Sequence, residues 1–307
     1  MVRKHTRRAA KAAFAIALGV PLVLGGTAAA SHSAAAKKPA IIVGTKNFPE
    51  QFILGQLYKQ ALQAKGFRVK YKENIGSSEL IDTALTSGKI NFYPEYTGVI
   101  VQVLAHKTSP STAGATFVAA KKFEEGRGFT LLRRTPFYDS DAFGTLTTTA
   151  KKYNLKTIED VKKVSTKLQY GGFPECQTRI TCFKGLTDVY GLTNLSFVPL
   201  SGISIYTALD QGKVDAGDVF TTDPQLASGK YTILTDTKHI FGFQNVAPVV
   251  SKKITKAYGL KFAKTVNAVS AKLTLKAMIA MNKAVIIDKQ SAAAVASAFL
   301  RANHLKK

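Results

Sequence analysis

Short hydrophobic runs and helical spacings alternate along the first third of the chain. Residues 41–43 form an apolar run that is typical of a buried strand. A helix is predicted next, with Asn47 as its cap, Pro49 in its first turn and Gly66 at its end, because apolar residues recur at helical spacing between these positions. Residues 67–72 then alternate between apolar and basic side chains, as expected of a half-exposed strand.

The alternation continues and predicts β–α units in series. A helix is expected over residues 78–87, a strand over 90–93 and a further helix from Thr97. Such a series favours a parallel α/β sheet, in which the loops after the strands face a ligand. The side chains that these loops present are Lys46, Ser77, Ser78 and Tyr96.

The rest of the chain repeats this arrangement and then becomes helical. After a further strand at 129–132, residues 135–142 are predicted to cross to a second α/β lobe, and residues 239–250 to cross back. Residues 254–305 are mostly amphipathic helix. We therefore expect two α/β lobes with a ligand cleft between them. The expected boundaries are 41–138 with 246–307 for lobe I, and 139–245 for lobe II.

One short pattern occurs once in each predicted lobe. Residues 83–90 and 207–214 both read Thr-Ala-Leu-x-x-Gly-Lys followed by Ile or Val, which predicts a helix end, a left-handed glycine and a strand start. Six residues beyond each copy stand Tyr96 and Phe220, each followed by threonine. This duplication places two aromatic residues at equivalent positions. The alternative is a common helix end that occurs twice by chance.

The N-terminus and the charge predict export. A basic segment and a short apolar run make residues 1–30 a predicted signal peptide, followed by a flexible tether at 31–40. Thr27 stands where a lipid-anchored bacterial protein needs cysteine, so no lipobox is visible, and we expect a periplasmic or extracellular protein associated with membrane or wall. The net charge of +24 is spread as doublets and favours a solvated basic surface over a nucleic-acid site.

Candidate chemistry favours binding over catalysis. The histidines are scattered, and motifs of metalloproteases, serine hydrolases and dinucleotide-binding folds are missing from the sequence, so neither an enzyme nor a cofactor or metal site is expected. Cys176 and Cys182 are expected to form a local disulfide in an oxidising compartment, the alternative being two unrelated thiols. Lys46 and Arg179 are candidates for holding an anionic group, although Arg179 and Glu175 are also spaced for a helix ion pair.

Several motifs resemble one family. The Lys46–Gln51 segment (Lys-Asn-Phe-Pro-Glu-Gln), the 93–98 segment (Tyr-Pro-Glu-Tyr-Thr-Gly) and the 220–223 segment (Phe-Thr-Thr-Asp) are similar to the substrate-binding proteins of osmoprotectant ABC importers, which bind glycine betaine, choline or carnitine. The likeness covers nearly all of the chain after residue 30. It implies a type II periplasmic-binding-protein fold that closes on a compatible solute and delivers it to a membrane permease.

The resemblance also implies a site, in which aromatic rings surround a trimethylammonium group and basic residues hold a carboxylate. At two positions where the family often has an aromatic ring, this chain has Asp141 and Gln244. Asp139 and Asp141 are therefore candidates for attracting a cation, or for a turn role at the crossing. The expected ligand-binding residues are Lys46, Gln51, Ser77, Ser78, Tyr96, Asp139, Asp141, Glu175, Arg179, Phe220 and Gln244.

These expectations define the partners and the alternatives. We expect a monomer that binds a small compatible solute and ABC permease subunits, and no nucleic acid. One alternative is a basic surface protein that adheres to anionic wall polymer, which steep salt dependence would reveal. Another is a binding protein of the same fold for a more polar, or a cationic but non-quaternary, solute.

Overall fold

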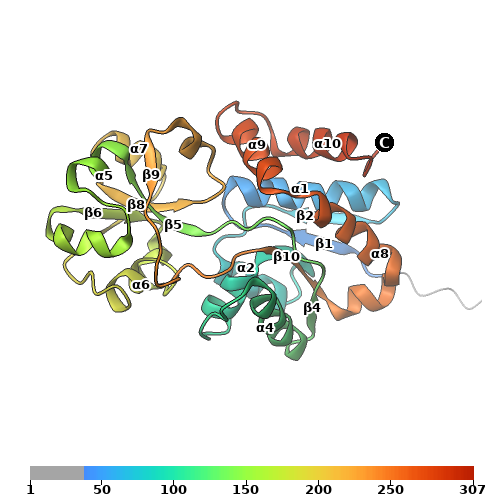
Figure 1. The fold of residues 1–307 in the computed structure, drawn as a ribbon. Coiled ribbons are helices and arrows are strands. Elements are labelled where there is room, and N and C mark those ends of the chain that lie inside the picture. Colours follow the sequence, from blue (N-terminus) through green and yellow to red (C-terminus); the bar gives the residue numbers. More distant parts are fainter. Residues whose placement is uncertain (1–37) are drawn as a thin grey trace, which may run out of the picture. The chain divides into compact units, whose positions relative to one another are not determined.

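A computed structural model describes residues 38–307 of the chain, which form one compact unit. The predicted signal peptide and most of the predicted tether lie outside the described residues. Two five-stranded mixed sheets carry the fold (Figure 1), and helices cover both.

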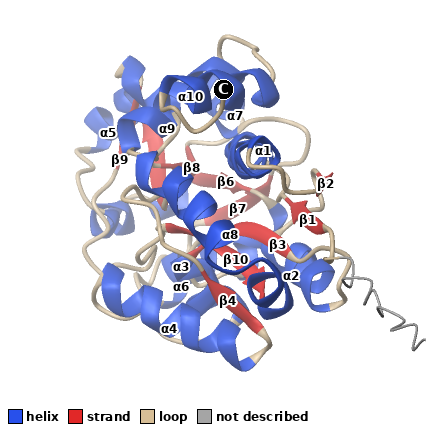
Figure 2. Cartoon of the chain, turned by 90° about the vertical axis from the view of Figure 1, so that its right-hand side faces the viewer, coloured by secondary structure: helices blue, strands red, loops and turns tan. Residues whose placement is uncertain are grey.

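The first sheet has the strand order β2-β1-β3-β10-β4. Its strands are β1 (Ile41–Gly44), β2 (Val69–Lys72), β3 (Phe92–Tyr96), β4 (Phe129–Leu131) and β10 (Val246–Ser251). Figures 1 and 2 show α1 and α10 on one side of this sheet and α2 and α4 on the other. The helices that accompany it are α1 (Pro49–Ala64), α2 (Ser78–Thr86), α3 (Thr97–Val99), which continues as a π-helical segment (Ile100–Leu104), α4 (Ala113–Gly126), α8 (Lys252–Lys272), α9 (Leu275–Ile286) and α10 (Ala292–Ala302).

The second sheet has the order β7-β6-β8-β5-β9. Its strands are β5 (Asp141–Leu146), β6 (Gln169–Gly172), β7 (Ser196–Pro199), β8 (Ala216–Phe220) and β9 (Tyr231–Ile233). The α-helices around it are short, and several connections are 3₁₀ turns instead. These elements are α5 (Thr147–Tyr153), α6 (Phe183–Asp188), α7 (Ile205–Asp210) and the 3₁₀ segments Ile158–Lys163, Ser165–Lys167, Pro174–Thr178 and Pro224–Ser228.

Both sheets combine parallel and antiparallel pairs, so the parallel arrangement predicted from the serial β–α units holds for β1, β2 and β3 and does not extend to the whole sheet. β1 runs parallel to β2 and β3, whereas β10 is antiparallel to β3 and β4. In the same way β6 runs parallel to β7 and β8, whereas β5 is antiparallel to β8 and β9. β5 and β10 are the strands that follow the two crossings. Each therefore enters its sheet from the other half of the chain, and its direction is not set by a β–α–β connection.

Separate apolar clusters lie on the two faces of the first sheet. One contains side chains of α1, α8, α9 and α10 together with β1, and the other contains side chains of α2, α4 and β4. Strands buried on both faces read as continuous apolar runs, which is why β1 was recognisable in the sequence. Within residues 38–307 no helix combines the length and the apolar character that a membrane span requires.

The duplicated pattern forms the same local structure in both sheets. Gly88 and Gly212 follow α2 and α7 with φ of 74° and 64°, the left-handed conformation that glycine adopts without steric cost. Tyr96 is the last residue of β3 and Phe220 the last of β8. The two aromatic residues therefore end equivalent strands, as the duplication predicts.

Two local predictions were wrong. Phe48, and not Asn47, is the cap of α1, since the chain stays extended at Phe48 and enters the helix at Pro49. The strand predicted at 90–93 is displaced and runs from Phe92 to Tyr96. The reason is that the Ile90 amide donates to the Ala84 carbonyl at 3.1 Å and completes the end of α2.

Candidate functional site

A cavity of about 60 Å³ lies where residues from the ends of strands in both sheets meet. All of the predicted ligand-binding residues except Gln51 line it. The first half of the chain contributes Lys46, Asn47, Phe48, Ser77, Ser78, Tyr96 and Val99, and the second half contributes Asp139, Asp141, Phe173, Glu175, Cys176, Arg179, Thr181, Cys182, Asp218, Phe220 and Gln244.

Aromatic rings from both sheets stack on one another at this cavity. The Phe48 ring lies 5.9 Å from the Phe220 ring, centroid to centroid, with 4° between the ring planes. The centroids of the Phe48 and Tyr96 rings are 6.2 Å apart, with 21° between the ring planes. Phe48 thus connects the two rings that the duplicated pattern predicts, and it was missing from the predicted site.

Lys46 is held beside these rings by a buried ion pair. Its Nζ donates to Glu95 Oε1 at 2.6 Å and to Ser78 Oγ at 3.1 Å, and it lies 4.4 Å from the centroid of the Tyr96 ring. Gln51 contacts the backbone of Lys46, since its Oε1 accepts a hydrogen bond from the Lys46 backbone N–H at 3.4 Å. A lysine buried in this way needs its carboxylate partner, since an unpaired buried ammonium is costly.

Glu50 joins the first sheet to the loop after β8. Its Oε1 accepts from the Tyr96 hydroxyl at 2.9 Å, and its Oε2 accepts from the Thr222 hydroxyl at 2.7 Å and from Asn282 Nδ2 at 2.8 Å. Burial raises the pKa of Glu50, whereas the hydrogen bonds from Thr222, Asn282 and Tyr96 lower it. The network fixes the orientation of the Tyr96 ring.

Arg179 does not pair with Glu175, contrary to one of the sequence interpretations. Residues Pro174–Thr178 form a 3₁₀ turn and Arg179 is extended, so the helical i, i+4 spacing does not apply. Instead Arg179 donates to Glu79 of α2, through Nε at 3.3 Å and through a terminal nitrogen at 2.7 Å. Partial burial raises the pKa of Glu79, but the hydrogen bonds from Arg179 and Ser77 outweigh this effect and lower the pKa to about 2.

Carboxyl groups of the second half also line this cavity. Asp139 Oδ1 accepts from the Thr222 amide at 3.2 Å, so Asp139 also stabilises the turn after β8. Burial and the nearby charge of Glu50 raise the pKa of Asp139. Burial raises the pKa of Asp141, although Arg179 and Lys46 oppose this. Asp218 is 6% exposed, and its Oδ1 has no hydrogen-bond partner within the described part of the chain.

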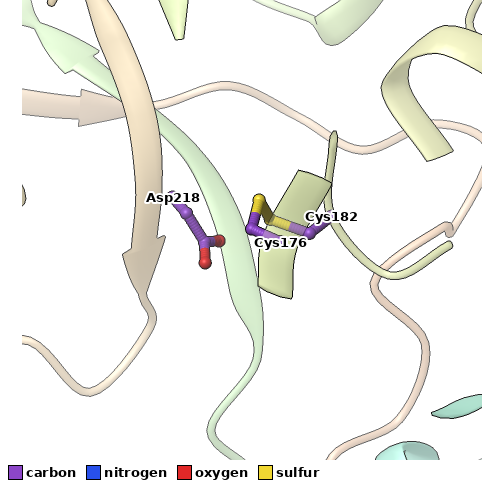
Figure 3. Close-up of side chains that lie close together, drawn as sticks. All are labelled: Cys176, Cys182 and Asp218. Carbon is purple, nitrogen blue, oxygen red and sulfur yellow. A yellow bond between two sulfur atoms is a disulfide. The ribbon is translucent and has the colours of Figure 1, made fainter. Parts of the chain in front are cut away.

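Cys176 and Cys182 form the disulfide that the sequence led us to expect. Figure 3 shows the Asp218 carboxyl group beside this bridge, and its oxygen lies within 4.8 Å of both sulfur atoms. A metal ion binds cysteine as thiolate, so the bridged sulfurs do not supply metal ligands. The bridge instead holds the loop that carries Glu175 and Arg179 next to β8.

Gln244 lines the cavity, but its amide group is used for structure. Its Oε1 accepts from the Val99 amide at 3.0 Å and its Nε2 donates to the Phe241 carbonyl at 2.9 Å. A Cβ at Gly98 would lie 2.6 Å from Gln244 Nε2, so the glycine permits this close approach.

The sequence interpretation missed Phe48, Phe173 and Asp218. A second repeat could have identified the two phenylalanines, because residues 48–50 and residues 173–175 both read Phe-Pro-Glu. Both phenylalanines are helix caps with proline directly after them, following β1 and β6. Asp218 stands two residues before Phe220, a spacing that puts both side chains on one face of a strand.

Two sheets of identical strand order with a polar and aromatic cavity between strand ends define a type II periplasmic-binding-protein fold. A solved structure of a glycine betaine/carnitine/choline ABC transporter matches with a TM-score of 0.70 and 21% identity, covering 86% of this chain and 99% of that one.

Sequence comparison gives the family. Residues 39–302 match OpuAC, the substrate-binding domain of the ABC-type glycine betaine transport system, and the chain belongs to this family. A glycine-betaine-binding protein of Pseudomonas aeruginosa is 30% identical over 281 residues, which cover 88% of this chain and 90% of the relative. The ergothioneine transport permease/ergothioneine-binding protein EgtU of Helicobacter pylori is 28% identical over 272 residues, and here the match covers 88% of this chain but 48% of the relative.

This family is extracytoplasmic and functions in transport: its members bind small solutes for ABC transporters and act with a permease. The chain is accordingly a substrate-binding protein of a glycine betaine/choline/carnitine-type ABC importer.

Proposed function

We propose that the chain binds a small solute with an alkylated ammonium group in the cavity between the two sheets, and that it delivers this solute to the permease without altering it. The proposal includes export, a monomeric protein and the absence of catalysis. The stack of Phe48 with Tyr96 and Phe220 is the observation that carries it, since an aromatic face attracts a cation and these rings come from both sheets.

The position of the rings supports a solute that touches both halves of the molecule. Tyr96 and Phe220 end strands of different sheets, and Phe48 lies between them. A ligand on this stack gains contacts from each half only when the halves are together. Ligand binding then shifts the equilibrium between separated and joined halves, which a permease can detect.

The test is isothermal titration of the purified protein with choline, glycine betaine, carnitine and ergothioneine. Tyr96→Ala and Phe220→Ala should each weaken binding of the preferred solute by about two- to thirty-fold, since a well-placed ring contributes about 0.5 to 2 kcal/mol. Tyr153→Ala on α5 is the matched control and should leave affinity unchanged. Unchanged affinity in both cavity variants would exclude this cavity as the binding site.

A further inference from the structure

We infer that the cavity selects a solute that carries a positive charge and no carboxylate, so that choline-like cations are preferred to betaines. This inference rests on the proposed solute-binding function and names its ligand class. It is carried by the charges around the cavity and by the register of β5 and β8.

The positive side chains at the cavity already have partners. Lys46 Nζ is 2.6 Å from Glu95 Oε1, and Glu95 is fully buried. Arg179 is 2.7 Å from Glu79 Oε2. A solute carboxylate would have to share each of these charges with a carboxylate that is already bound, and could use only the remaining donors of Lys46 and Arg179. Within residues 38–307, the carboxyl groups that line the cavity without an ion pair of this kind are Asp139, Asp141, Glu175 and Asp218.

Strand register brings two of these carboxyl groups to the Phe220 ring. Asp218 and Phe220 are two residues apart on β8, so their side chains share one face of the sheet. Asp141 is the cross-strand partner of Phe220 on β5, and cross-strand partners also share a face. An ammonium group on this face would have an aromatic ring and two carboxyl groups as neighbours.

Asp218 is buried with one carboxyl oxygen unpaired among the described residues. It is 6% exposed, and its Oδ1 has no hydrogen-bond partner within residues 38–307. Burial and then Asp141 raise the pKa of Asp218. The nearby charge of Arg179 opposes this rise, but Arg179 is itself paired with Glu79. A cation bound beside Asp218 would favour its charged form and so replace the proton that burial retains.

The fold does not require acidic residues at these positions. In the first sheet, the residue two before Tyr96 is Pro94 and the cross-strand partner of Tyr96 is Val246. The same strand order and the same aromatic strand end are thus built with apolar neighbours. The acidic pair beside Phe220 is therefore assigned to ligand selection and not to folding.

Choline and glycine betaine distinguish a cavity that selects against a carboxylate from one that accepts it, because both solutes have the trimethylammonium group and only the betaine has a carboxylate. By isothermal titration, we expect choline to bind at least about ten-fold more tightly. Asp218→Asn should weaken choline binding at least about ten-fold and leave the betaine affinity equal or higher. Asp141→Asn should act in the same direction, which provides a second reading if the Asp218 variant unfolds.

Asp210→Asn is the matched control, since Asp210 is exposed on α7 and is not among the residues that line the cavity. It should leave both affinities unchanged. Equal affinities for the two solutes, with a ratio that neither aspartate variant alters, would overturn the ligand class and leave the proposed function in place. Failure of the unaltered protein to bind any of the solutes would overturn the proposed function, and the ligand class with it.

Discussion

The two sheets place an aromatic residue at the same strand end and surround it with different chemistry. Tyr96 and Phe220 both have a backbone amide held by a carboxylate, from Glu95 at 2.8 Å and from Asp223 at 2.8 Å respectively. Glu95 is paired with Lys46, whereas Asp223 accepts from the Tyr206 hydroxyl and has no cationic partner within residues 38–307. A repeated scaffold thus supplies equivalent positions, while the neighbouring side chains decide the local charge.

The repeated Phe-Pro-Glu segments show the same divergence. Glu50 is buried and accepts from three side chains, of Tyr96, Thr222 and Asn282. Glu175 occupies the corresponding place after Pro174, but its carboxyl group lines the cavity and accepts no side-chain hydrogen bond within the described residues. One glutamate therefore supports the structure and the other is free to face solute.

The largest expected effect on stability comes from replacing one of these two glutamates, Glu50 or Glu175. Glu50→Ala removes the acceptor of three buried donors and should lower the free energy of unfolding by about 3 kcal/mol, because each unsatisfied buried group is costly. Glu175→Ala is the matched variant and should cost less than about 1 kcal/mol. Urea unfolding of both variants is the measurement, and equal losses would show that the two segments do not differ as described.

A smaller effect is expected from the titration of Asp223. Burial is the main reason that the pKa of Asp223 is raised from 3.8 to about 6, and the proximity of Glu50 contributes. A raised carboxyl pKa means that the folded state holds a proton that the unfolded state has released. The contribution of Asp223 to stability is then fully present below pH 3.8 and is lost as pH rises through about 6.

Asp223→Asn removes this titration and tests its sign. Relative to the unaltered protein, the variant should gain up to about 2 to 3 kcal/mol between pH 4 and pH 7, given about 1.4 kcal/mol for each pKa unit. Urea unfolding at several pH values measures the difference. Asp210→Asn is the contrasting variant, because hydrogen bonds from Lys230 and Tyr231 lower the pKa of Asp210 and its removal should act in the opposite direction. A difference that does not vary with pH would contradict the raised pKa.

Local features of the fold could be predicted from the sequence, and long-range features could not. β1 and the glycines after α2 and α7 are recognisable because an apolar run and a left-handed turn depend on neighbouring residues. The direction of β10 depends on β3 and β4, which are far away in the chain, so the mixed sheets were missed.

The same limit applies to the site. Tyr96 and Phe220 were found through a repeated pattern, and Phe48 could have been found through the Phe-Pro-Glu repeat. The partner of Arg179 could not have been found from the sequence, because Glu79 is 100 residues away and nothing in the local spacing favours it over Glu175. Local spacing identifies candidates, whereas pairing between the halves decides their roles.

The smallest expected effect concerns this pairing of Arg179 with Glu79. Arg179 lines both the cavity and a larger groove of about 1340 Å³, and Glu79 lines the groove, so the ion pair lies between them. The Glu79 side chain is 47% exposed, and a pair so accessible to water contributes less than about 1 kcal/mol. The pKa of Glu79 is lowered from 4.5 to about 2, so this contribution is present above pH 4.5 and is lost as pH falls through about 2.

Glu79→Gln should therefore change stability by less than about 1 kcal/mol at pH 7 but speed the release of bound solute by a few-fold, because the pair connects residues that move apart when the halves separate. Stopped-flow measurement of solute dissociation tests this. Asp188→Asn is the matched control, since it breaks an exposed ion pair with Lys184 within one half of the molecule and should leave dissociation unchanged. An equal effect of the two variants would mean that the Arg179–Glu79 pair contributes surface charge and does not restrain solute release.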